Sequence, residues 1–321
     1  MAEEIIKSYE NRKEVIFMPS RLNFKNVELG DRDLLDKYLK KESGFIGEHN
    51  FADLYMWGYE YKSMYALYNG YLYIKMTSPE KGADFYLMPF GGRGGFCEAL
   101  KVLIDEGKRT DGKLYFCSVS RWQKEIAEMV FKDNINLVLS RDFADYVYLS
   151  EKLIELKGKK LHGKKNHLNR FMKDNEGRWN YEDLDDFNAE EFYAFQLKWV
   201  SLHNPKEFEG ETAAVKALLE ARRELGVKGG LIRLEGKVIA MTLGTEFNSE
   251  VFVVNIEKAL PNMNGAYQII NNEFAKRNLK GYKYINREED MGLEGLRQAK
   301  MSYAPEFLGE AYEGYYCDKI C

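Results

Sequence analysis

The chain has few cysteines, no long apolar run and no N-terminal export pattern. Cys97, Cys117, Cys317 and Cys321 are its only cysteines, and the pair near the C-terminus has no partner histidines, so it is a poor zinc site. No apolar run reaches the roughly 18 residues of a membrane-spanning helix. The first residues lack the basic and apolar regions of a signal peptide. We therefore expect a cytoplasmic protein with reduced thiols and no metal.

An excess of charge is also absent. The 47 Lys and Arg residues against 51 Asp and Glu residues leave a net charge of −4, so no global field attracts nucleic acid or a membrane. Six prolines and 45% hydrophobic residues are ordinary for a folded protein, which excludes disorder. The length of 321 residues fits roughly two domains. Any site for a polyanion must therefore be local.

Hydrophobic periodicity predicts the same order of elements in both halves: β, α, α, β, β, β, α, β, α, β. In the first half, Asn69-Gly70 is a strong hairpin signal, and the glycine-rich residues 91–95 precede a predicted helix. In the second half, a strand at 251–256 precedes a loop at 260–265 and a helix at 266–278. We expect an α/β (α+β) fold with mixed central sheets flanked by helices, in two domains of residues 1–150 and 151–321.

A strongly basic segment without acids lies between residues 157 and 173. Its cations are Lys157, Lys159, Lys160, Lys164, Lys165, Arg170 and Lys173. Apolar residues interleave with these charges, so one face can pack while the other presents ammonium groups. A phosphate or RNA backbone is one partner, with contacts expected from Lys159, Lys160, Lys164, Lys165, Asn166 and Arg170. A solvated face neutralised by the acidic residues at 182–191 is the alternative.

Five polar side chains follow the predicted strand at 282–285: Asn286, Arg287, Glu288, Glu289 and Asp290. Side chains just past the carboxyl end of a strand are well placed to line a cleft. A helix N-terminus, where acids cap free amides, also explains the acids. It leaves the arginines unexplained, although a guanidinium suits a carboxylate or phosphate. We expect substrate contacts from Asn286, Arg287, Asp290 and Arg297.

The order of elements is similar to the GNAT-type acyltransferase fold, and two such halves resemble the tandem Fem-type transferases that use aminoacyl-tRNA. Three motifs are more specific: FADLYMW at 51–57, LKGKKLHGKKNHLNRF at 156–171 and NREEDMGLEGLRQAKMSY at 286–303. They resemble the DUF2156 family, that of the soluble C-terminal domain of phosphatidylglycerol lysyltransferases. The resemblance implies two tandem GNAT-like domains that move an aminoacyl group from aminoacyl-tRNA to an acceptor.

The resemblance also identifies a candidate donor loop before the helix at 266–278. In GNAT enzymes this junction holds the donor pyrophosphate with successive backbone amides, because a helix N-terminus attracts anions. Asn262, Gly265 and Ala266 occupy the corresponding positions here. The leading Gln or Arg of that pattern is replaced by Asn262. The run Gly265-Ala266-Tyr267 also lacks the second small residue that the pattern requires. The degraded pattern weakens coenzyme A as the donor, and a plain turn is the alternative.

Acyl transfer needs a base for the proton of the acceptor and an acid for the leaving oxygen. Glu257, at the end of the strand at 251–256, and Glu288 are the candidate bases. Tyr303 is the candidate acid, placed after the last helix as in many GNAT enzymes. A backbone amide near Asn255 or Ile256 would meet the oxyanion.

Two functions are consistent with these features. The first is an acyl- or aminoacyltransferase that uses aminoacyl-tRNA or acyl-CoA, with tRNA as a partner and an amine or hydroxyl of a small molecule, peptide or lipid head group as acceptor. The second is a non-catalytic binding module with a GNAT-like fold and a basic phosphate- or RNA-binding patch. No cofactor is firmly implied, and the sequence leaves the oligomeric state open.

Overall fold

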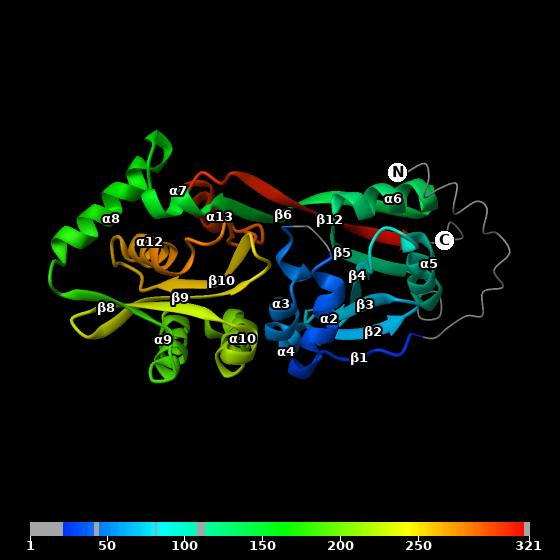
Figure 1. Cartoon of the computed structure of the whole chain (residues 1–321), viewed down its shortest axis with the longest axis horizontal. Helices are drawn as coiled ribbons and strands as arrows, with labels where there is room; N and C mark the ends of the chain where they lie inside the picture. Colours follow the sequence, from blue (N-terminus) through cyan, green and yellow to red (C-terminus); the bar gives the residue numbers. More distant parts are fainter. Residues whose placement is uncertain (1–21, 42–44, 81, 108–112, 318–321) are drawn as a thin grey trace. The chain divides into compact units, whose positions relative to one another are not determined.

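The computed structural model describes residues 22–41, 45–80, 82–107 and 113–317. The chain divides into two compact units, one of Met1–Arg141 with Glu310–Cys321 and one of Asp142–Gly309. It passes from one unit to the other within β6 (Ile135–Leu149) and returns within β12 (Phe307–Cys317) (Figure 1). The units therefore differ from a division at residue 150, because residues 142–150 lie in the second unit and residues 310–317 in the first.

The first unit is built on a mixed sheet with the strand order β1-β2-β3-β4-β5-β12. Its other strands are β1 (Lys25–Asn26), β2 (Met64–Tyr68), β3 (Tyr71–Thr77), β4 (Asp84–Phe90) and β5 (Lys113–Val119). β4 and β5 are parallel, and the other neighbours are antiparallel. The predicted hairpin is confirmed: Asn69 and Gly70 both have positive φ, and Tyr68 pairs with Tyr71 across the turn.

The helices of the first unit are α2 (Arg32–Leu39), α3 (Phe51–Met56), α4 (Gly58–Tyr61), α5 (Phe96–Gly107) and α6 (Arg121–Phe131). Helix α5 buries an apolar face of Phe96, Leu100 and Leu103 in the core of this unit. α6 begins at Ser120, which forms a capping box with Gln123. Short 3₁₀ turns cover Leu29–Asp31, Gly47–His49 and Lys132–Asn134.

The second unit has a sheet with the order β6-β11-β10-β9-β8-β7. Its strands besides β6 are β7 (Trp179–Asp183), β8 (Lys228–Leu234), β9 (Lys237–Glu246), β10 (Val251–Ala259) and β11 (Tyr284–Asn286). β10 and β11 are parallel, and the other neighbours are antiparallel. A register shift between Val254 and Ile256 marks a bulge in β10 at Asn255.

Helices cover both faces of this second sheet. They are α7 (Ser150–Glu155), α8 (His162–Asp174), α9 (Ala189–Ser201), α10 (Glu209–Glu220), α11 (Arg222–Leu225), α12 (Ala266–Asn278) and α13 (Glu294–Met301). Within this unit, α12 lies on one face with α7 and α8 against it, while α9 and α10 lie on the other (Figure 1). Ile269, Ile270 and Phe274 bury the apolar face of α12 in the core, where Leu168 and Phe171 of α8 join them.

The two halves of the sequence repeat one order of elements. The first half runs β2-β3-β4-α5-β5-α6-β6 and the second half β8-β9-β10-α12-β11-α13-β12. The last strand of each half, however, pairs with a strand of the other half: Leu149 of β6 lies opposite Tyr284 of β11, and Cys317 of β12 lies opposite Lys113 of β5. The expected mixed α/β fold is confirmed, and each repeat completes its partner's sheet.

Candidate functional site

The candidate site lies in the second unit, where β10 and β11 stop pairing. The two strands are hydrogen-bonded only from Val251 to Val253, and the chain leaves β11 after Asn286 while β10 continues to Ala259. The backbone amide of Arg287 then donates to the carbonyl of Tyr146 in β6. This geometry places the side chains that follow Asn286 opposite those at the end of β10.

Arg287 and Glu257 join these two ends. Arg287 Nη2 lies 2.7 Å from Glu257 Oε1, and the side chains are 11% and 8% exposed. Asn271 of α12 donates to the other oxygen, Glu257 Oε2, at 2.9 Å. Arg287 Nη1 is buried and has no hydrogen-bond partner among the described residues. The site therefore holds one guanidinium donor that no described group satisfies.

Two further side chains complete this group. The guanidinium carbon of Arg287 lies 4.8 Å from the ring centroid of Tyr303, and Lys164 Nζ of α8 lies 4.4 Å from the same centroid. Burial raises the pKa of Tyr303, so its hydroxyl keeps its proton at neutral pH. We call Lys164, Glu257, Asn271, Arg287 and Tyr303 the Arg287 cluster. It contains two cations and one carboxylate.

Glu288 lies beside this cluster and is held by neighbouring groups. Its Oε1 accepts a hydrogen bond from Asn255 at the β10 bulge, 2.8 Å away, and Asn255 Oδ1 accepts one from Thr245. Its φ of 56° lies in the left-handed region. Lys300 of α13 fixes this turn by donating from Nζ to the carbonyl oxygens of Arg287, Glu288 and Glu289.

The other residues expected to contact substrate are bonded within the chain. Asn286 is fully buried, and its side chain contacts Asp145 and the amide of Glu288, both at 2.7 Å. Asp290 is also fully buried and accepts two hydrogen bonds from Arg297, at 2.7 and 2.9 Å. These contacts hold the loop at 286–297 in place. A substrate contact by Asn286, Asp290 or Arg297 stays a prediction.

The basic segment does not form one continuous helix. Leu156 and Gly158 have positive φ, so the chain turns between α7 and a 3₁₀ turn at Lys159–Leu161 that precedes α8. At this turn a surface hollow of about 420 Å³ is lined by Leu156, Lys157, Gly158, Lys159, His162 and Lys165. We call it the basic hollow. Lys160 and Asn166 are exposed nearby, whereas Arg170 pairs with Asp174 one turn along α8.

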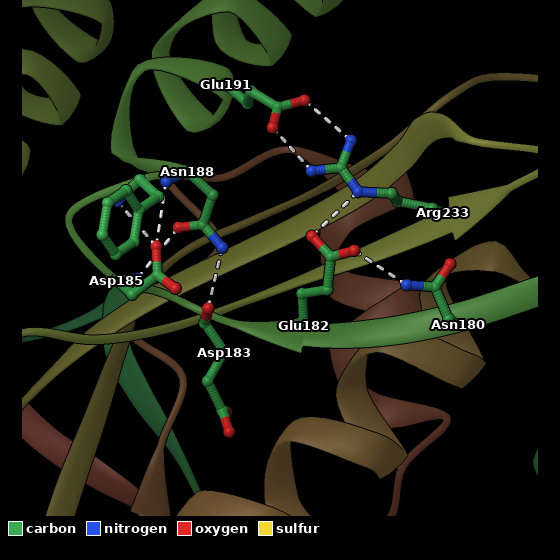
Figure 2. Close-up of polar contacts among 8 residues, drawn as sticks. Asn180, Glu182, Asp183, Asp185, Asn188, Glu191 and Arg233 are labelled. Atoms are coloured by element: carbon green, nitrogen blue, oxygen red, sulfur yellow. Dashed lines mark hydrogen bonds and ion pairs between the residues drawn. The ribbon is translucent and has the colours of Figure 1, made fainter.

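The acidic residues at 182–191 do not pair with this segment within the described part of the chain. Figure 2 shows Arg233 of β8 between Glu191 of α9, at 2.6 and 2.7 Å, and Glu182 of β7, at 2.8 Å. Asp186 pairs with Arg222 and Arg223 of α11. Among the described residues, the one carboxylate that pairs with a lysine of the hollow is Glu155, which lies 2.9 Å from Lys157. The acidic run therefore forms no direct ion pair with the basic segment among the described residues, and the alternative of a solvated basic face stays open.

The candidate donor loop is covered by α8. Gly265 precedes α12 with φ 85°, and a Cβ at this position would lie 2.7 Å from Phe171 Cβ and 2.8 Å from the carbonyl oxygen of His167. Ala266 is fully buried, and Asn262 is exposed. In the first unit, the corresponding loop surrounds the Tyr71 hydroxyl, which donates to the carbonyls of Gly92 and Gly94. Side chains or backbone of the chain itself thus fill both loops.

The described residues show neither a metal-binding group nor a membrane-spanning helix. Residues 22–317, apart from the gaps given above, hold no group of three His, Cys, Asp or Glu side chains arranged to bind a metal ion. None of the helices described in the structure is both long and apolar enough to cross a membrane. Cys97 and Cys117 are free thiols, and Cys321 lies outside the described residues.

Two residues of the site were not expected from sequence. Asn271 belongs to Asn271-Asn272-Glu273, a polar run that is buried in the middle of α12, and such a run in an apolar helix is a detectable signal. Lys300 carries no comparable signal, since a lysine in the last turn of a surface helix is common. Lys164 was expected to contact phosphate, but it lies over Tyr303 instead of lining the basic hollow.

Comparison with known proteins gives the same fold. A conserved protein of unknown function from Bacteroides thetaiotaomicron shares 32% identity with a TM-score of 0.85, over 92% of this chain and 99% of that chain. The C-terminal domain (DUF2156) of an Agrobacterium fabrum protein described as a lysylphosphatidylglycerol synthetase is 11% identical, with a TM-score of 0.62. The match covers 90% of this chain and 92% of that domain. A tandem GNAT protein from the clavulanic acid biosynthesis pathway is 10% identical, with a TM-score of 0.50. The match covers 93% of this chain and 100% of that chain. The last two likenesses show the fold alone.

The sequence also matches a family and a curated relative. An uncharacterised protein of Mycoplasmoides gallisepticum is 22% identical over 178 residues, 54% of this chain, and the chain spans 57% of the length of that relative. Residues 41–313 match the family described as "Phosphatidylglycerol lysyltransferase, C-terminal". The family supports an aminoacyltransferase or acyltransferase type of function. The chain belongs to the phosphatidylglycerol lysyltransferase C-terminal family, as the motifs at 156–171 and 286–303 predicted.

Proposed function

We propose that the chain transfers an aminoacyl group from an aminoacyl-tRNA to an amine or hydroxyl acceptor at the Arg287 cluster. The observation that carries this proposal is the buried, unpartnered Nη1 of Arg287. A buried N–H group without an acceptor costs free energy, so an oxygen of a substrate is favoured at this position. The carbonyl oxygen of an ester gains negative charge when a nucleophile adds to it, and a fixed guanidinium stabilises that charge.

The closed donor loops favour RNA over coenzyme A as the carrier of the acyl group. A pyrophosphate needs free backbone amides at a helix N-terminus. The carbonyl of His167 and the side chain of Phe171 press against Gly265, and Tyr71 fills the loop of the first unit. These contacts leave less room at both loops for coenzyme A to bind as it does in GNAT enzymes.

The basic hollow supports the same choice of donor. Its lysines have no carboxylate within 4.0 Å in the described residues, except Lys157, which pairs with Glu155. Exposed ammonium groups gathered on one surface of a chain with net charge −4 suit a phosphodiester backbone. We therefore assign Lys159 and Lys165 to the RNA phosphates, with Lys160, Asn166 and Arg170 at the margin.

The roles of the remaining groups follow from their bonds. Glu257 has both oxygens occupied, so it holds the guanidinium of Arg287 in position. Tyr303 is the proposed acid, because it is protonated and lies against Arg287. The acceptor is an amine or hydroxyl of a small molecule, a peptide or a lipid head group, and phosphatidylglycerol is the first acceptor to test because the family's description names it.

The test gives the whole chain tRNA that carries a labelled amino acid, with phosphatidylglycerol vesicles or a mixture of amines as acceptor. Label should move from the RNA to one acceptor. Arg287→Lys should lower the initial rate about 10²- to 10³-fold, because one ammonium cannot replace a guanidinium held by Glu257. Arg178→Lys, which alters an exposed ion pair with Glu235 in the same unit, is the matched control and should keep the rate.

Two results would overturn the proposal. Binding of tRNA without transfer to any acceptor would favour the non-catalytic binding module. Transfer at the wild-type rate by Arg287→Lys would place the reaction away from the Arg287 cluster.

A further inference from the structure

Lys164 and Lys165 are neighbours in sequence with opposite surroundings. Lys165 is exposed and lines the basic hollow. Lys164 is half-buried, and its Nζ lies 4.4 Å from the ring centroid of Tyr303 on the other side of α8. Successive residues of a helix point about 100° apart, so one helix serves two sites. The basic segment predicts the same role for both lysines, and the packing of α8 separates them.

The two candidate bases expected from sequence are already engaged. Glu257 accepts from Arg287 Nη2 and from Asn271, one bond to each oxygen. Glu288 accepts from Asn255. Proton transfer to Glu257 would break its ion pair with Arg287, so Glu257 is poorly placed to take a proton from the acceptor. Glu288 has one carboxylate oxygen bonded to Asn255.

Lys164 lies in surroundings that disfavour its ammonium form. No carboxylate lies within 4.0 Å of its Nζ in the described residues. The groups that face it are the phenol ring of Tyr303, the guanidinium of Arg287 and, farther away, the carboxylate of Glu257. Burial and the charge of Arg287 lower the pKa of Lys164, and Glu257 opposes this effect. An amine in such a place can lose its proton and then accept another.

We propose that Lys164 is the general base of the transfer reaction, in place of Glu257 or Glu288. The inference rests on the proposed function. Neutral Nζ takes the proton of the acceptor amine or hydroxyl while the acceptor atom bonds to the ester carbonyl carbon. The carbon–oxygen bond to the ribose then breaks, and the leaving oxygen takes a proton from Tyr303. The Lys164 ammonium returns the proton to Tyr303, so the enzyme regains its starting state and no other reactant is needed.

The first test measures the ionisation of Lys164 directly and needs no transfer activity. Trace acetylation of the folded chain by acetic anhydride across the alkaline range, read by mass spectrometry, gives the pKa of each lysine. The pKa of Lys164 should lie below the ordinary value of a lysine, because burial and Arg287 disfavour its ammonium form. An ordinary or raised pKa for Lys164 would overturn the inference, whatever the chain does with tRNA.

The second test separates a base from a positive charge. Lys164→Arg keeps the charge but cannot lose its proton, so the transfer rate should fall about 10²- to 10⁴-fold and lose its rise with pH. Lys173→Arg on the exposed part of α8 is the control and should behave as wild type. A Lys164→Arg variant with the wild-type rate and pH profile would overturn the inference. If the wild-type chain transferred nothing, the proposed function would fail, and the acetylation result would still decide whether Lys164 is an available base.

Discussion

Arg287 Nη2 lies 2.7 Å from Glu257 Oε1, so one ion pair joins β10 to the chain beyond β11 after the two strands stop pairing. Because both side chains are largely buried, Arg287→Met should leave Glu257 without its partner and lower the free energy of unfolding by about 3–5 kcal/mol. The double variant with Glu257→Gln should recover part of this loss. Urea denaturation measures both.

The matched control for that pair is Arg178→Met. Its partner Glu235 lies 2.7 Å away, but both side chains are at least half exposed. Solvent screens such a pair, so the loss should stay within about 1 kcal/mol. Equal losses for Arg287→Met and Arg178→Met would contradict the assignment of a buried ion pair at the site.

Asp290 should make stability depend on pH. Burial opposes its ionisation, but hydrogen bonds from Arg297, Tyr146 and Gly292 outweigh that effect and hold its pKa below the usual value. A lowered pKa in the fold stabilises the protein above the unfolded value of about 4 and loses that contribution as pH falls. The unfolding free energy should therefore drop between about pH 5 and pH 3.

Asp290→Asn should flatten this drop, since the amide does not titrate. Asp174→Asn, which removes an exposed pair with Arg170, should keep the wild-type slope. Denaturant titrations at several pH values check both variants. A wild-type slope in Asp290→Asn would show that other carboxylates cause the acid sensitivity.

Gly265 should be intolerant of a side chain because α8 lies against it. Gly265→Ala would place a Cβ 2.7 Å from Phe171 Cβ at a φ that side chains rarely adopt, so we expect a loss of about 1–3 kcal/mol in unfolding free energy. Gly281→Ala, where no atom lies within 4 Å of the new Cβ, should change little. Equal melting temperatures for the two variants would mean that α8 does not cover the loop in solution.

The basic hollow should bind RNA through charge. Transfer RNA that carries no amino acid should bind the wild-type chain with a steep salt dependence. The double variant Lys159→Glu with Lys165→Glu should lower the affinity and reduce the slope of log binding constant against log salt concentration by about 2. Lys237→Glu, at the first residue of β9, makes the same charge change as either single variant, Lys159→Glu or Lys165→Glu, and is the control for them. Fluorescence anisotropy gives each affinity. Unchanged binding in the Lys159 and Lys165 variants would place the RNA elsewhere.

The order of elements was predictable because strand and helix periodicities are local signals. The hairpin at Asn69-Gly70 and the break at Gly158 also follow from single residues with positive φ. The exchange of β6 and β12 between the two sheets was not predictable. The alternation of apolar and polar residues at 135–149 does not determine which sheet edge the strand joins. That depends on pairing with residues far away in the sequence.

The site was predictable in part. Arg287, Glu257 and Tyr303 were found by their places after strands and helices, and the structure brings them together. Lys164 was grouped with Lys165 because adjacent lysines give the same sequence signal. Asp290 and Arg297 were expected to face substrate, but they bond to each other, and a sequence cannot show when two opposite charges satisfy one another.

The most direct test of the transferase proposal compares donors in one assay. The whole chain is given either a labelled aminoacyl-tRNA or a labelled acyl-CoA, with the same acceptors, and the initial rate of label transfer is measured. The closed loops and the basic hollow predict that label moves from the tRNA alone, at a rate that Arg287→Lys lowers. Transfer from acyl-CoA, or no transfer from either donor while tRNA still binds, would contradict it.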